Sequence, residues 1–354
     1  MNDVRETDAR SYNPAQAVLY GQLVEIAYQM YDNAPANPEP SPPSPFFPGF
    51  KFIAWVQMKD FILEESDWTF YGLIAQSIAD ANKFILAIRG TSNLTEWWDD
   101  LTSMVLVPLE GFGKVGYGFN RIYQTLRVVT YAPTEALGAR AATRSLESAG
   151  TFAQQVAAAV QQHAAAGARR SESTVEAPPP AIESVEVTGH SLGSALATLY
   201  VAENAKAGLV KTPMICTFAS PRVGDPDFAT TFNELGLTSW RIVNELDIVP
   251  KLPFLGFQHV ETEHAYNSGW SVDWTLSCWH ALTTYLHLLD PKQPLAPECR
   301  WPPKTDATAA LRAPVAAARA ATVQAAPADK EIAVSVPQDH GTTIAITIKI
   351  GQSS

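Results

Sequence analysis

Apolar residues recur at helical and at strand spacing along the first part of the chain, and these two patterns predict its elements. Residues 14–31, PAQAVLYGQLVEIAYQMY, place apolar side chains at helical intervals and predict a helix. The proline-rich residues 34–49 exclude a helix or a central strand and predict a surface loop. Three predicted strands follow, at residues 52–58, 70–79 and 83–90. The last of these contains a continuous apolar run, which is typical of a strand buried on both faces.

Beyond residue 90, predicted helices and strands alternate. Helices are expected at residues 94–107, 118–130, 148–166, 192–206 and about 226–234, and a final helix begins near residue 279. The strands between them are expected at residues 183–188, 213–219 and 239–244. This alternation predicts an α/β fold, in which a mainly parallel central sheet is flanked by helices on both faces.

The last part of the chain has a different composition. Residues 301–329 are mostly Ala, Pro and small polar residues, which predicts a linker. In residues 330–354, EIAVSV and TTIAITIKI alternate apolar and polar positions around PQDHG, which predicts a β-hairpin. A hairpin of this size is not stable alone, so we expect it to pack on the body, extend a sheet edge or join two chains as a homodimer. The predicted domains are therefore a body over residues 1–300, the linker and the hairpin extension.

Charge and composition exclude several classes of function. The chain has 354 residues and a formal net charge of −11, which argues against nucleic acid and against strong attraction to an anionic membrane. No apolar stretch reaches the roughly 18 residues of a transmembrane helix. The N-terminus, MNDVRETDAR, is polar and lacks the apolar run of a secretory signal. Either the chain stays inside the cell or a leader has been removed, so its location stays open.

Cysteine usage gives no sign of a metal site. The three cysteines, Cys216, Cys278 and Cys299, are too few for a disulfide framework in a chain of this length, although a bridge between the last two is open. Cys216 lies in the apolar run MICTF, which indicates a buried small side chain. The chain has no CxxC, no HExxH and no paired Cys/His cluster, so neither a metal nor a cofactor is expected.

The stretch EVTGHSLGSA contains G-x-S-x-G between a predicted strand and a predicted helix. In that context the motif is a sharp turn that lifts the central serine, Ser191, clear of the sheet. Side chains at Gly189 and Gly193 would clash with the neighbouring strand and helix, and the first N–H groups of the helix lie where an oxyanion would form. The alternative is a serine that merely caps a helix after a glycine turn.

A serine nucleophile needs a histidine to accept its proton and a carboxylate to orient that histidine. In α/β hydrolases the chain order is Ser, then Asp or Glu, then His. The segment RIVNELDIVPKLP supplies Asp247 in a turn after a predicted strand. Glu245 is the nearest rival for the acid, and Asp225, beyond an earlier strand, is a weaker one.

Five histidines follow the acid: His259, His264, His280, His287 and His340. The first two lie in segments typical of strands, and His340 lies in the predicted hairpin. His280 and His287 are seven residues apart in CWHALTTYLHLLD, so both would face the same way in one helix. His280 lies where a loop meets the last helix, which favours it as the base; His287 lies two turns further on, which favours packing.

Several of these motifs together resemble the class 3 lipases, the fungal-type triacylglycerol lipase family of α/β hydrolases. The resemblance covers about residues 14–290 and follows the family's order of motifs: RGTSNLTEWWDDL, GYGF, VTGHSLGSALATL, FASPRVGD, VNELDIVPKLP, FQHVETE and HALTTYL. The chain departs from the family at Gly116, where a histidine is frequent, and at Ser194, where many members have glycine.

The resemblance implies a role for each matching residue. Ser191 would be the nucleophile, Asp247 the triad acid and His280 the base. The backbone N–H groups of Thr91 and Leu192 would bind the oxygen of the tetrahedral intermediate. His190 is expected to point away from Ser191 and to pack, while Arg89 is either a structural salt-bridge partner or a functional residue.

The resemblance also implies a helical lid at about residues 93–108. The side chains expected to cover the site belong to one face of this segment: Trp97, Trp98, Leu101, Met104 and Val105. The alternative for such a stripe is an ordinary buried helix face.

The function implied is that of a serine carboxylester hydrolase acting on acylglycerols or simpler lipid esters, with a lipid–water interface as the setting for a lid. A phospholipase A1 or a feruloyl-type esterase on the same scaffold is the alternative. A non-catalytic lipid-binding protein is a third hypothesis, which the three filled triad positions disfavour.

Overall fold

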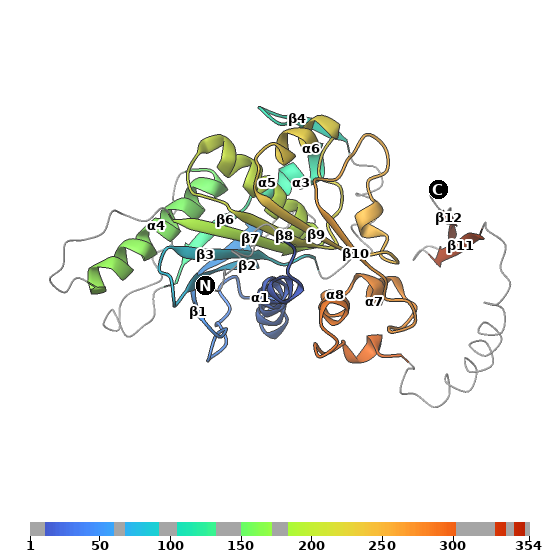
Figure 1. Cartoon of the computed structure of the whole chain (residues 1–354), viewed down its shortest axis with the longest axis horizontal. Coiled ribbons are helices and arrows are strands. Elements are labelled where there is room, and N and C mark those ends of the chain that lie inside the picture. Colours follow the sequence, from blue (N-terminus) through green and yellow to red (C-terminus); the bar gives the residue numbers. More distant parts are fainter. Residues whose placement is uncertain are drawn as a thin grey trace, which may run out of the picture. The chain divides into compact units, whose positions relative to one another are not determined.

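The computed structural model describes residues 11–59, 68–91, 105–131, 150–171, 183–301, 330–337 and 343–350. The chain divides into two compact units, Met1–Arg300 and Trp301–Ser354. The described part of the first unit is built on one large sheet (Figure 1).

That sheet has eight strands in the order β10-β9-β8-β7-β3-β2-β1-β6. The strands are β1 (Phe50–Lys59), β2 (Trp68–Ser77), β3 (Lys83–Ile88), β6 (Arg127–Thr130), β7 (Ser184–His190), β8 (Met214–Phe218), β9 (Thr238–Asn244) and β10 (Glu263–Tyr266). From β3 to β10 the neighbouring strands are parallel, whereas β2, β1 and β6 continue the sheet with antiparallel pairs. The α/β fold with a mainly parallel central sheet, predicted from the alternating elements, is confirmed.

Helices cover both faces of the sheet (Figure 1). One face carries α1 (Pro14–Asn33) and α8 (Leu282–Leu289), and the other carries α3 (Tyr117–Tyr123), α4 (Phe152–Ser171) and α5 (Leu192–Ala207). A further helix, α6 (Pro226–Asn233), begins at Asp225, whose carboxylate caps it. The core beneath α1 and α8 includes Leu23, Phe218, Tyr285 and Leu286, all of which are buried. The apolar face of α1 thus packs against the sheet, as the helical spacing of its apolar residues predicted.

The helix expected at residues 94–107 does not extend to its predicted end. Residues 106 and 107 belong to a strand, β4 (Leu106–Leu109), which pairs with β5 (Gly113–Gly116). Pro108 explains the difference, because a proline disfavours the helical conformation of the residue before it. Residues 94–104 of that prediction lie outside the described residues.

The helix expected at residues 118–130 is also too long. Helix α3 ends at Tyr123, and residues 127–130 form β6, which pairs with the edge of β1. The sequence there is RVVT, and β-branched side chains favour strands because they pack well on a pleated surface.

The final helix is two helices. α7 (Leu276–His280) is separated from α8 by Ala281, which is extended at φ −56° and ψ 131°. His280 therefore ends α7, and Ala281 separates it from α8, so it does not share a helix with His287. Cys278 of α7 is joined by a disulfide to Cys299, which settles the pairing that the sequence left open.

The second unit contains β11 (Lys330–Pro337) and β12 (Thr343–Ile350), which pair antiparallel. In the part of the chain that the structure describes, no helix is both long enough and apolar enough to cross a membrane.

Candidate active site

The turn between β7 and α5 consists of Ser191 alone, because β7 ends at the residue before it and α5 begins at the residue after it. Ser191 has φ 56° and ψ −126°, a conformation that L-residues rarely adopt and that is found where surrounding structure imposes it. A Cβ on Gly189 would lie 2.4 Å from the carbonyl oxygen of Gly193, and one on Gly193 would lie 2.3 Å from that of Ile88. Both glycines are therefore required by close backbone contacts on the two sides of the turn.

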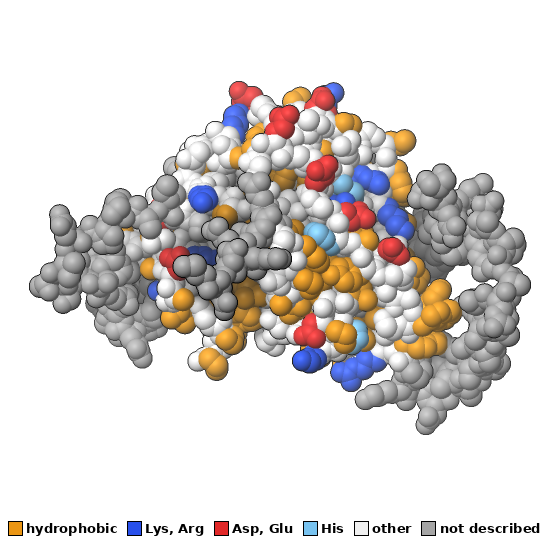
Figure 2. Space-filling view, in the orientation of Figure 1, with side chains coloured by type: hydrophobic (Ala, Val, Ile, Leu, Met, Phe, Trp, Pro, Cys, Tyr) orange, Lys and Arg blue, Asp and Glu red, His pale blue; other side chains and the backbone are white. Residues whose placement is uncertain are grey.

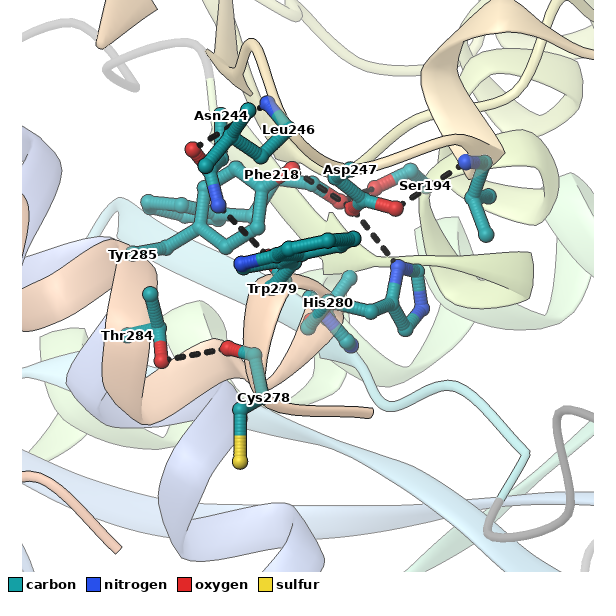
Figure 3. A network of polar contacts seen from close by, with 12 residues as sticks. Ser194, Phe218, Asn244, Leu246, Asp247, Cys278, Trp279, His280, Thr284 and Tyr285 are labelled. Carbon is teal, nitrogen blue, oxygen red and sulfur yellow. Dashed lines mark hydrogen bonds and ion pairs between the residues drawn. The ribbon is translucent and has the colours of Figure 1, made fainter. Parts of the chain in front are cut away.

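Ser194 fastens the same turn to the sheet. Its buried hydroxyl lies 2.7 Å from the carbonyl oxygen of Gly189 and 2.9 Å from that of Phe218, and it donates to these two acceptors (Figure 3). The backbone N–H of Ser191 donates to the same Phe218 oxygen at 2.9 Å. The departure from glycine at position 194 thus adds a hydrogen bond at the base of the turn.

Asp247 lies three residues beyond β9, at the same edge of the sheet as Ser191, and its side chain is 1% exposed. One carboxylate oxygen, Oδ1, accepts the backbone N–H of Val249 at 2.9 Å. The other, Oδ2, accepts Nδ1–H of His280 and the hydroxyl of Tyr285, each at 2.7 Å (Figure 3). Burial, followed by the charge of Asp247, raises the pKa of Tyr285 well above its usual range, so this hydroxyl stays a donor.

The bond to Asp247 sets the tautomer of His280. Because Nδ1 carries the hydrogen that Asp247 accepts, Nε2 of the neutral ring has a free lone pair. Nε2 is buried and has no hydrogen-bond partner among the described residues. His280 therefore offers a buried, correctly polarised acceptor in the molecule, which is what a general base for a serine hydroxyl requires.

The backbone just before His280 is held by side-chain hydrogen bonds (Figure 3). The Asn244 amide donates to the carbonyl of Trp279 at 2.8 Å, and its oxygen accepts the N–H of Ser268 at 3.1 Å. The hydroxyl of Thr284 donates to the carbonyl of Cys278 at 2.6 Å. These bonds hold the break between α7 and α8, and with it the position of the imidazole.

His190 joins His280 to the loop after β3. Its Nε2–H donates to the His280 carbonyl at 2.8 Å, and its Nδ1 accepts the hydroxyl of Tyr28 at 2.8 Å. The oxygen of Tyr28 in turn accepts the N–H of Gly90 at 2.8 Å. Burial, with His280 as a second cause, lowers the pKa of His190 well below its usual range, so the ring is neutral as this chain of bonds requires. His190 is buried as expected, but it also connects two parts of the site.

The loop after β3 passes close to the turn that carries Ser191. A Cβ on Gly90 would lie 2.9 Å from Cβ of Ser191, so only glycine fits there. Thr91, the next residue, is half-buried, and Leu192 is the first residue of α5, where helical N–H groups lack partners within the helix. Both predicted oxyanion donors thus belong to segments that contact Ser191 or adjoin it in sequence.

Arg89 supports this loop from inside the protein. Its guanidinium is 2% exposed, donates to the carbonyl oxygens of Phe70 and Gly90, and lies 3.6 Å from the ring centre of Tyr31. Of the two alternatives for Arg89, the salt bridge is not found among the described residues, where its contacts are carbonyl groups and aromatic rings.

The other candidate acids serve local structure. Glu245 is exposed and accepts the side-chain amide of Asn267 at 2.6 Å. Asp225 accepts the N–H of Phe228 at 2.9 Å and that of Lys114 at 3.0 Å. Neither carboxylate faces a histidine in the part of the chain that the structure describes.

The other candidate histidines lie elsewhere. His259 donates to the carbonyl of Pro250, His264 stacks on the ring of Tyr12, and His287 donates to the carbonyl of Gln293 at 2.9 Å. His340 lies outside the described residues.

Most of the predicted lid is also outside the described residues, which applies to Trp97, Trp98, Leu101 and Met104. Val105 is described and is 67% exposed. It is not helical, and its carbonyl accepts the N–H of Tyr117 at 2.7 Å. Val105 therefore leads into β4 with its side chain facing solvent.

Sequence reasoning assigned no role to three residues of the site: Tyr285, Asn244 and Tyr28. Tyr285 had a signal, since it belongs to the motif HALTTYL that also contains His280. Asn244 lies at the end of a predicted strand, three residues before the predicted acid, Asp247. Tyr28 had no sequence signal, because it lies 162 residues from His190 and only the fold brings the two side chains together.

A serine at a strained strand-to-helix turn, followed along the chain by a buried Asp–His pair, defines the arrangement of an α/β hydrolase. Comparison with known protein families shows which group of α/β hydrolases the chain is similar to: residues 85–257 match the model of "Lipase (class 3)". The resemblance to the class 3 lipases that the motifs predicted is therefore confirmed over these residues.

Curated relatives include plant and fungal enzymes. Phospholipase A1-II 1 of Oryza sativa is 28% identical over 237 residues, which cover 63% of this chain and 55% of the relative. A lipase of Rhizomucor miehei is 44% identical over 85 residues, or 23% of each chain. The solved structure of the Rhizomucor miehei lipase propeptide complex aligns with a TM-score of 0.47 and 24% identity, covering 71% of this chain and 67% of that one. The chain thus spans about half the length of the curated relative with the longer match.

Proposed function

We propose that the chain is a serine carboxylester hydrolase that cleaves acylglycerols or simpler lipid esters, and that the unit Met1–Arg300 carries this activity. The observation that carries the proposal is the buried His280–Asp247 pair, 2.7 Å between Nδ1 and Oδ2, with Nε2 of the same ring left as an acceptor. Its position beside the Ser191 turn, fixed by the bond from His190 to the His280 carbonyl, supports the assignment.

In the proposed reaction, Ser191 Oγ attacks the acyl carbonyl while Nε2 of His280 takes its proton. Asp247 stabilises the imidazolium through Oδ2, and the backbone N–H groups of Thr91 and Leu192 bind the oxyanion. The proton passes to the departing alcohol, which leaves an acyl-enzyme. Water then attacks the acyl-enzyme with the same base, releases the fatty acid and restores Ser191.

Hydrolysis of p-nitrophenyl butyrate by the full chain and by Ser191→Ala tests the mechanism. Loss of the nucleophile lowers kcat by about 10⁶-fold in a well-studied serine hydrolase and leaves only about 10³–10⁴-fold acceleration over water, so the variant should be near background. Equal rates in the two proteins would contradict the proposal. They would favour instead a non-catalytic lipid-binding protein on this fold.

A phospholipase A1 activity is the second candidate, which the similarity to the rice phospholipase A1 favours. The same triad would cleave the sn-1 ester of a phospholipid, and the head group would decide between the two substrates. Initial rates on triacylglycerol emulsions and on phosphatidylcholine, measured with one enzyme preparation, distinguish them. A much higher rate on phosphatidylcholine would select the phospholipase.

We further propose that the hairpin of β11 and β12 serves association between two copies of the chain. Among the described residues these strands pair only with each other, so each retains one edge with unpaired backbone groups. Sedimentation velocity of the full chain over a range of concentrations tests this. A monomer at all concentrations would contradict it.

A further inference from the structure

The segment between β10 and α7 exposes large apolar side chains at the surface. Trp270 is 50% exposed, Trp274 is 40% exposed and Leu276 is 37% exposed. The rings of Trp270 and Trp274 lie 4.3 Å apart between centres, and Trp274 contacts Trp279 at 5.8 Å. Figure 2 shows hydrophobic side chains gathered in the region where Figure 1 places α7. We call Trp270, Trp274 and Leu276 the tryptophan platform.

We propose that the tryptophan platform docks the protein on the surface of an uncharged or zwitterionic lipid aggregate. Tryptophan is the side chain that favours the boundary between water and lipid, since its ring is apolar and its N–H remains polar. The proposal rests on the proposed function and extends it, because it states that the lipid substrate is bound as an aggregate rather than as single dissolved molecules.

The platform is mounted rigidly. Val272, between the two tryptophans, is fully buried and forms an antiparallel bridge with Arg300. The N–H of Asp273 donates to the carbonyl of Cys299 at 2.9 Å, and Cys299 is joined by the disulfide to Cys278. A surface that is already ordered loses little conformational entropy when it binds, so exposed rings held in this way favour association.

Charge selects the kind of lipid. From Asn267 to Ser277 the only ionisable side chain is Asp273, and hydroxyl residues alternate with the apolar ones. The chain as a whole carries a net charge of −11, which opposes approach to an anionic surface. Such a surface fits a neutral or zwitterionic lipid, whose head groups accept hydrogen bonds from hydroxyl groups.

Continuity with the site favours a lipid surface over a protein partner. Trp279, the innermost ring of the cluster, immediately precedes His280, and its carbonyl is held by Asn244. A lipid surface resting on the platform would therefore present its esters near the base that cleaves them. A second copy of this chain is the other occupant to be tested.

Binding is best measured in the Ser191→Ala background, where the lipid is not consumed. Flotation with phosphatidylcholine vesicles should carry this protein, and W270S/W274S in the same background should lower the partition coefficient by at least about tenfold. Ile78→Ser is the matched control, because Ile78 is 68% exposed at the end of β2 and its loss should change binding by less than about twofold. Replacing part of the phosphatidylcholine by phosphatidylserine should weaken binding.

Tryptophan fluorescence provides a second measurement that needs no platform variant. Phosphatidylcholine brominated in its acyl chains should quench the emission of the Ser191→Ala protein, since bromine quenches only rings that enter the lipid. Absence of quenching, unchanged flotation of W270S/W274S, or binding to anionic vesicles alone would overturn the proposal. So would a dimer that W270S/W274S dissociates, since the platform would then bind a second copy.

Turnover of the soluble p-nitrophenyl butyrate separates the two proposals. W270S/W274S in the wild-type background should retain this activity within about twofold, because the described ring contacts of the two tryptophans are with each other and with Trp279, not with a triad side chain. If wild type fails to hydrolyse the ester while lipid binding still depends on the platform, the proposed function falls and the docking surface stands.

Discussion

The segments that follow β8 and β9 each contain a buried aspartate, and the two aspartates differ in what they can do. Asp225 and Asp247 are both buried, and both accept backbone N–H groups at the start of a short helical segment. Asp225 uses Oδ1 for two backbone donors, whereas Asp247 uses Oδ1 for one and keeps Oδ2 for His280 and Tyr285. The comparison teaches that a capping carboxylate becomes available for chemistry only when its second oxygen meets a titratable partner.

The largest expected effect comes from removing that partner. His280→Ala should lower kcat for p-nitrophenyl butyrate by about 10⁴-fold or more, because no other described group is placed to take the proton from Ser191. His287→Ala should leave kcat within about threefold and lower the free energy of unfolding by about 1 kcal/mol, since it loses the bond to Gln293. Steady-state kinetics and urea unfolding of both variants check the contrast, which fails if both variants lose activity equally.

The next effect tests the two carboxylates directly. Asp247→Asn should lower kcat by about 10⁴-fold while the protein stays folded, because the amide no longer stabilises the imidazolium and can favour the wrong tautomer. Asp225→Asn should retain activity within about twofold, since asparagine caps a helix as well as aspartate does. Matching circular dichroism spectra would show that both variants are folded. Comparable losses of kcat would contradict the different roles given to Asp225 and Asp247.

The smallest expected effect concerns His190 and His259. Unlike His280, these two histidines form their described hydrogen bonds with a tyrosine hydroxyl and with backbone carbonyls rather than with a carboxylate. Burial lowers the pKa of His190 well below its usual range, and burial with the charge of Arg241 lowers that of His259 to about 3. Below about pH 6.5 the unfolded chain takes up protons that the folded chain refuses, so stability falls as the pH falls. Each such histidine contributes a slope of up to about 1.4 kcal/mol per pH unit until its folded pKa is reached.

His190→Asn should make this acid slope shallower by about one histidine, because asparagine binds no proton in this range. Urea unfolding of wild type and variant at several pH values between about 7 and 5 provides the measurement. Parallel slopes in the two proteins would show that His190 takes up a proton in the folded state as readily as in the unfolded chain.

Local sequence was sufficient for the features that depend on neighbouring residues. The Ser191 turn is specified by its two glycines, and the structure shows the backbone contacts that make each necessary. The main strands and helices followed from periodicity, because each buries one face or both. The predicted acid and base, Asp247 and His280, rest on their order along the chain and on the turns that contain them, and the structure shows that the two side chains share a hydrogen bond.

Features that depend on distant partners were mispredicted or missed. Residues 106–109 and 127–130 are too short for periodicity to separate helix from strand, and the strands β5 and β1 decide the outcome. The link from Gly90 through Tyr28 to His190 joins three elements that are far apart in sequence. No local pattern records such a link, since each residue alone is an ordinary buried or half-buried side chain.

The backbone angles of Ser191, the proposed nucleophile, lower the stability of the fold. At φ 56° the chain would prefer glycine, and keeping a serine there costs about 1–3 kcal/mol. Replacement by glycine would thus relieve a cost that the native protein bears only for the sake of its hydroxyl group. Any selection for thermal stability that does not also monitor turnover would consequently tend to discard the hydroxyl group on which the proposed turnover depends.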